Sequence, residues 1–68
     1  MPASSDHAEL STLRSALDES TRRVVAVGDR YRDTEDSAIA GDLDSAERAL
    51  VAARRALDRA LRALATRR

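Results

Sequence analysis

The fold is decided by the stretch LDSAERALVAARRALDRALRAL, residues 43–64, in which a leucine recurs every seven residues. Its apolar residues follow one another at spacings of three and four, which is the period of a helix that packs along a narrow seam. The stretch therefore predicts an amphipathic helix over about residues 43–66. Its apolar stripe consists of Leu43, Ala46, Leu50, Ala53, Leu57, Ala60 and Leu64, and a parallel row of Ala49, Ala56 and Ala63 lies beside it.

The first half of the chain carries a second stripe with the same spacing. It consists of Leu10, Leu13, Leu17, Ser20, Val24, Val27 and Tyr31, with Thr34 and Ala38 as a weaker continuation. Two such stripes in 68 residues predict an all-α fold, an antiparallel two-helix hairpin with coiled-coil-like packing. Ser20 and Thr34 are polar members of the stripe, and they either specify the register or lie at its margin.

Several residues mark helix ends. Asp6 and Glu9 are spaced like a capping box at the start of the first helix, and Asp44 and Glu47 have the same spacing before the second. Gly41 is the natural left-handed stop for the first helix. These signals predict one hairpin domain over residues 1–68, with a turn or loop around residues 33–42.

Two positions fit the end of the first helix. The helix spans about residues 6–40 or about residues 6–32, and the absence of a helix breaker in residues 37–40 favours the longer form. The longer helix leaves Leu10 and Leu13 without an opposite residue in the hairpin. The shorter helix places Leu10 opposite the end of the second helix.

The charges are balanced over the chain but not along it. Twelve Arg and twelve Asp plus Glu give a formal net charge of zero, which removes the simplest electrostatic case for nucleic acid or membrane as a partner. Residues 1–36 have a net charge of −3 and residues 37–68 a net charge of +3. In an antiparallel hairpin we expect the acidic residues Asp6, Glu9, Asp18 and Glu19 to lie alongside Arg54, Arg55, Arg59 and Arg62.

The sequence contains no pattern that indicates catalysis or a cofactor. It has no cysteine, and His7 has no second ligand at metal spacing. Asp33, Glu35 and Asp36 lack the spacing and the glycine of an EF-hand loop. A small helical hairpin offers no concave pocket, so we expect neither enzyme activity nor a cofactor. No run spans a membrane and the N-terminus has no secretion signal, so the expected compartment is the cytoplasm.

A two-helix hairpin of this size is too small for a large core of its own. We therefore expect a non-catalytic protein–protein interaction or oligomerisation module, with a regulatory or adaptor role. Its partner is either a second copy, giving a homodimeric four-helix bundle, or a larger helical protein. The extra alanine row either serves such an assembly or reflects the helix propensity of alanine. The predicted interface consists of Leu10, Leu13, Leu17, Val24, Val27, Tyr31, Leu43, Leu50, Leu57 and Leu64.

Two alternatives assign the chain to other functional classes. Residues 54–68 hold six Arg and one Asp, a pattern that favours contact with nucleic-acid phosphates. In addition, residues 39–41 (Ile-Ala-Gly) resemble the Trp-Xaa-Gly turn of the WXG100-like substrates of type VII secretion, and residues 31–35 resemble the YxxxD/E export signal of that family. The resemblance implies a secreted helical hairpin. The chain has no tryptophan, and its signal-like segment precedes the second helix.

Overall fold

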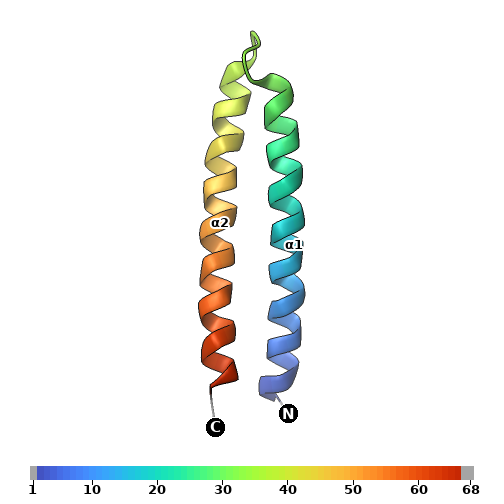
Figure 1. The fold of residues 1–68 in the computed structure, drawn as a ribbon, viewed down its shortest axis with the longest axis vertical. Coiled ribbons are helices and arrows are strands. Elements are labelled where there is room, and N and C mark those ends of the chain that lie inside the picture. Colours follow the sequence, from blue (N-terminus) through green and yellow to red (C-terminus); the bar gives the residue numbers. More distant parts are fainter. Residues whose placement is uncertain (1, 67–68) are drawn as a thin grey trace.

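The computed structural model describes residues 2–66 and shows two antiparallel helices joined by a short loop (Figure 1). Helix α1 spans Pro2–Tyr31 and helix α2 spans Ser37–Ala65, and the two ends of the described chain lie together at the end opposite the loop. The predicted all-α hairpin is confirmed. Its radius of gyration is 15.7 Å, whereas a globular chain of this length has about 11 Å. The molecule is therefore a thin rod.

The loop ends α1 earlier than the favoured prediction placed it. The longer first helix, to residue 40, is wrong, because Asp33 adopts a positive φ of 63° and takes the chain out of the helix. The Thr34 hydroxyl donates a 2.6 Å hydrogen bond to the Tyr31 carbonyl and accepts a 3.1 Å bond from the Asp36 amide. One threonine thus satisfies backbone groups at both helix ends, which is a common use of hydroxyls in turns.

The residues that the sequence suggested as helix ends, Gly41 and the two capping pairs, lie inside the helices. Residues 37–40 belong to α2, and Gly41 is a helical residue of α2 without a left-handed conformation, so the predicted stop at Gly41 is wrong. The proposed capping pairs, Asp6 with Glu9 and Asp44 with Glu47, lie inside the helices rather than at their starts. Residues 39–41 therefore do not occupy the turn in which the type VII resemblance placed them.

The helices meet along two rows that have a seven-residue period. All eight side chains of these rows are half-buried. The rows are Leu10, Leu17, Val24 and Tyr31 in α1 and Leu43, Leu50, Leu57 and Leu64 in α2. Leu10 and Leu64 line the same groove, as the shorter first helix predicted. The register of the hairpin therefore follows from its leucine rows.

Beside these rows, at four of six positions of the predicted stripes the more buried residue is the one that follows the predicted residue: Arg14, Thr21, Gly28 and Leu61. Leu61 is 6% exposed whereas Ala60 is exposed, and Leu13 is 48% exposed. Residues three and four positions after a central leucine point to opposite sides of the contact, because a helix has 3.6 residues per turn. Leu13, Ala53 and Ala60, which belong to the predicted stripes, are exposed in the hairpin. On the other side, Gly28 and Leu61 are buried and Arg14, Thr21 and Glu47 are half-buried, whereas Arg54 is exposed.

Two polar residues of the predicted stripe take no part in this contact. Ser20 is exposed and Thr34 lies in the loop, so neither sets the register of the helices. Thr21 is half-buried instead, and its hydroxyl donates a 2.7 Å hydrogen bond to the Leu17 carbonyl of its own helix. This bond satisfies the hydroxyl without a partner from α2.

Candidate interaction surface

On one broad side of the hairpin, ion pairs link the two helices. We call this side the charged face, and the residues of its interhelical pairs are Arg14, Asp18, Arg32, Asp44, Arg54 and Asp58. Arg14 donates to Asp58 over 3.1 Å, and Arg54 lies 3.5 Å from both Asp18 and Asp58. Arg54 thus continues a chain of alternating charges across the helix contact. The Arg54 side chain is 44% exposed, so each such pair contributes little by itself. Two of these pairs, Arg14–Asp58 and Asp18–Arg54, connect α1 with α2 along this side.

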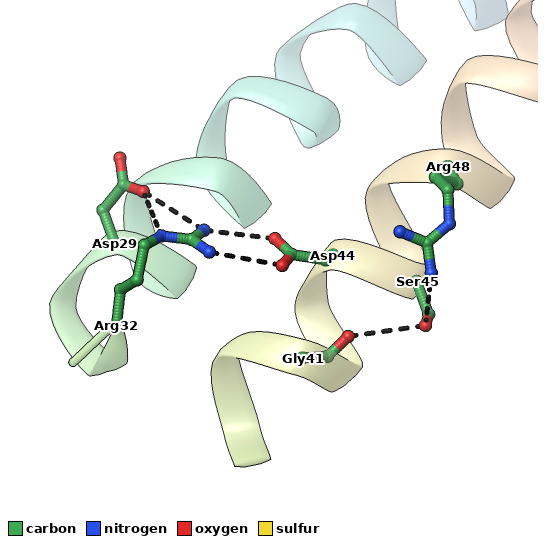
Figure 2. A network of polar contacts seen from close by, with 6 residues as sticks. All are labelled: Asp29, Arg32, Gly41, Asp44, Ser45 and Arg48. Atoms are coloured by element: carbon green, nitrogen blue, oxygen red, sulfur yellow. Dashed lines mark hydrogen bonds and ion pairs between the residues drawn. The ribbon is translucent and has the colours of Figure 1, made fainter. Parts of the chain in front are cut away.

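The charged face ends beside the loop in a bidentate pair (Figure 2). Two guanidinium nitrogens of Arg32 donate to the two carboxylate oxygens of Asp44 over 3.1 and 3.2 Å, and Arg32 also reaches Asp29 at 3.4 Å. The hydrogen bonds from Arg32 lower the pKa of Asp44, and the same bonds raise the pKa of Arg32. This pair ties the end of α1 to α2 next to the turn.

The predicted match between acidic and basic residues is found at one place. Asp18 faces Arg54, as expected. Glu19 instead binds Arg22 and Arg23 of its own helix, and the hydrogen bond from Arg22 lowers the pKa of Glu19. Among the residues that the structure describes, Asp6 and Glu9 form no ion pair, nor do the three other predicted arginines, Arg55, Arg59 and Arg62.

The opposite broad side, which we call the open face, is mainly apolar. It carries the positions three residues after each central leucine, and both exposed large hydrophobic residues, Leu13 and Ile39, belong to it. Its two central rows are Asp6, Leu13, Ser20 and Val27 in α1 and Ile39, Ala46, Ala53 and Ala60 in α2. Its margins are Glu9, Ala16, Arg23 and Arg30 in α1 and Asp42, Ala49, Ala56 and Ala63 in α2.

A shallow groove crosses the open face near the termini. It has a volume of about 510 Å³. Its lining combines the apolar side chains of both helices with two carboxylates, and consists of Asp6, Glu9, Leu10, Leu13, Ala60, Ala63 and Leu64. No titratable group here is enclosed, so the groove offers shape for an apolar side chain rather than a place for acid–base chemistry.

Nine of the ten predicted interface residues are half-buried, and Leu13 is the exception. Sequence reasoning missed Leu61 and Ala40, the two buried hydrophobic residues of the described chain. The sequence did contain a signal for Leu61. After Leu57 the stripe can continue at spacing three, through Ala60, or at spacing four, through Leu61. Choosing the larger apolar residue would have rotated the predicted seam toward the charged face.

The described residues show no group of three or more His, Cys, Asp or Glu side chains placed to hold a metal ion. Neither helix, within residues 2–66, is long and apolar enough to cross a bilayer. Comparisons of the chain with protein-family models, with curated proteins and with solved structures each gave no match. The two faces of the hairpin are therefore its candidate functional features.

Proposed function

We propose that this chain is a non-catalytic self-association module, whose open face is covered by a second copy and which serves a regulatory or adaptor role. The observation that carries the proposal is the size of the core. Within the described residues only Ala40 and Leu61 are buried hydrophobic residues, while Leu13 and Ile39 remain exposed on one face. A core of two residues is small even for a chain of this length.

The surface area supports the same proposal. The hairpin exposes 5169 Å², whereas a folded monomer of 7.4 kDa is expected to expose about 4,200 Å². The excess of about 1,000 Å² is close to the roughly 800 Å² that one partner buries in a specific interface. Covering the open face would bring the exposed area of each chain to the ordinary value for its mass.

Solution mass by light scattering, with helicity by circular dichroism, tests the proposal over a series of dilutions. We expect a helical dimer whose mass and melting temperature both fall on dilution, because folding and association are coupled. A matched pair of variants locates the surface: Ala60→Gln lies on the open face and Ala52→Gln is exposed outside it. Ala60→Gln should dissociate the dimer, whereas Ala52→Gln should not. A helical monomer at every concentration would contradict the proposal.

A second function is favoured by the outer side of α2. Arg48, Arg55, Arg59 and Arg62 are exposed there and form no ion pair with another described residue. Arginines on one helix side favour contact with a polyanion, and such binding weakens steeply with added salt. Retention on heparin or DNA at low salt, lost in Arg55→Gln and Arg59→Gln, tests this function. Equal elution of these variants and the native chain would exclude it.

A further inference from the structure

We infer that the second copy lies on the open face with its loop at the same end as the loop of the first, so that α1 of each copy packs against α2 of the other. This inference rests on the proposed self-association and specifies its geometry. The two-fold axis then runs along the length of the hairpin.

The ion pairs between the helices show which residues of α1 and α2 lie side by side, at the same level along the rod. In Arg14–Asp58, Asp18–Arg54 and Arg32–Asp44 the two residue numbers add up to between 72 and 76. Residues with this sum therefore lie at the same level. A two-fold axis along the rod keeps each level unchanged, so a residue of α1 meets the residue of the second copy's α2 that shares its level.

Side-chain size favours this orientation. At the level of Leu13 the second copy presents Ala60, and at the level of Val27 it presents Ala46, so each large side chain faces a small one. Alternating large and small residues allow two layers to interdigitate. With the copies reversed end to end, Leu13 would face Val27 on one side of the bundle and Ala60 would face Ala46 on the other.

The groove near the termini points to the same orientation. Leu13 is both part of the lining of this groove and the most exposed large hydrophobic residue of the open face. The Leu13 side chain and the groove lie at the same level of the rod. Each Leu13 can therefore enter the groove of the other copy only when the termini of both copies lie at the same end. Ile39, 42% exposed near the loop, then meets the loop end of the second copy, whereas reversal would place it near Asp6.

The charged residues at the margins of the open face also fit the proposed orientation. Arg30 at the margin of α1 and Asp42 at the margin of α2 share one level, and within the described residues neither forms an ion pair in its own hairpin. Across the proposed interface the Arg30 side chain of each copy lies opposite Asp42 of the other. The remaining marginal residues of α2 are alanines, so no like charges meet there. The long rows of open-face residues thus fit a second copy in one orientation.

Two measurements test the orientation. The chain has no cysteine, so Glu35→Cys in the exposed loop carries one spin label per copy without other changes. In the proposed dimer the two labels lie at one end, separated by about the width of a bundle, two to three times the 8–10 Å between packed helices. Reversed copies would separate them by nearly the 54 Å length of the hairpin.

Charge exchange gives an independent readout. Arg30→Asp and Asp42→Arg should each weaken the dimer, and the double variant Arg30→Asp/Asp42→Arg should regain most of the lost affinity. Labels far apart, or a double variant weaker than both single ones, in a chain that still dimerises would overturn the orientation and leave self-association standing. A chain that stays monomeric at high concentration would overturn both.

Discussion

Arg32, the first residue after α1, and Asp44 of α2 form two parallel hydrogen bonds of 3.1 and 3.2 Å that link the helices beside the loop. The Arg32 guanidinium also reaches Asp29 of α1, which holds it in place for Asp44. This pair has a defined geometry, because a planar guanidinium matches both oxygens of a carboxylate. It also makes folding depend on pH.

Acid should destabilise the hairpin through this pair. The pKa of Asp44 is lowered by the hydrogen bonds from Arg32, so the folded state favours the charged carboxylate. The resulting stability is present above the ordinary carboxyl pKa of about 4 and is lost as the pH falls through the lower pKa of the folded state. Asp44→Asn should therefore show a lower melting temperature than the native chain at pH 7 and a smaller further loss between pH 5 and pH 2, followed by circular dichroism. Equal losses in both proteins would contradict this role for Asp44.

Leu61 should be the most sensitive leucine of the hairpin. It is 6% exposed, and truncation of a buried leucine costs about 2–5 kcal/mol through lost burial and a residual cavity. Leu61→Ala should therefore largely unfold the hairpin at micromolar concentration, as judged by its helicity. Leu57→Ala, in the half-buried central row of the same helix, should cost less. A larger loss in Leu57→Ala would show that the contact is centred on the predicted stripe after all.

The fold class and the central rows could be predicted from the sequence, because a seven-residue leucine period has one common structural meaning. The rotation of the helices could not. Leu13 and the alanines at positions 53 and 60 are more apolar than Arg14 and Arg54, yet the arginines flank the contact. Their guanidinium groups form ion pairs with Asp58 and Asp18 of the opposite helix. A reading that counts only apolar residues therefore assigns the open face to the hairpin core.

The loop was misplaced for a similarly local reason. Gly41 is the residue with the greatest conformational freedom in this region, but the chain turns at Asp33, whose φ is 63°. Asp tolerates the left-handed conformation better than most residues, and the Thr34 hydroxyl supplies the hydrogen bonds that complete the turn. The combination of Asp33 with Thr34 was therefore a stronger stop than a glycine within a run of helix formers.

The two glycines, Gly28 and Gly41, both lie within helices, where alanine would be more favourable if the space allows it. A Cβ added to Gly28 would lie 3.5 Å from the Leu43 Cβ, an ordinary van der Waals distance, and a Cβ at Gly41 would meet nothing within 4 Å. Alanine is favoured over glycine inside a helix by about 1 kcal/mol. Both Gly28→Ala and Gly41→Ala should raise the melting temperature at fixed protein concentration, by roughly 4–8 °C per kcal/mol. A lower melting temperature in Gly28→Ala alone would mean that the helices approach more closely there than the structure shows.

The turn itself can be stabilised at Asp33. This residue adopts a left-handed conformation that costs most L-residues about 1–2 kcal/mol and costs glycine almost nothing. Glycine also gives the unfolded chain more freedom, which offsets part of the gain. Asp33→Gly should therefore stabilise the hairpin by up to about 1 kcal/mol, and Asp33→Val should destabilise it, because a β-branched residue is strained at positive φ. Thermal unfolding at one fixed concentration measures both effects separately from association. If Asp33→Val melted at or above the native temperature, the left-handed turn would not be the conformation in solution, and the break between α1 and α2 would have to lie elsewhere in residues 32–36.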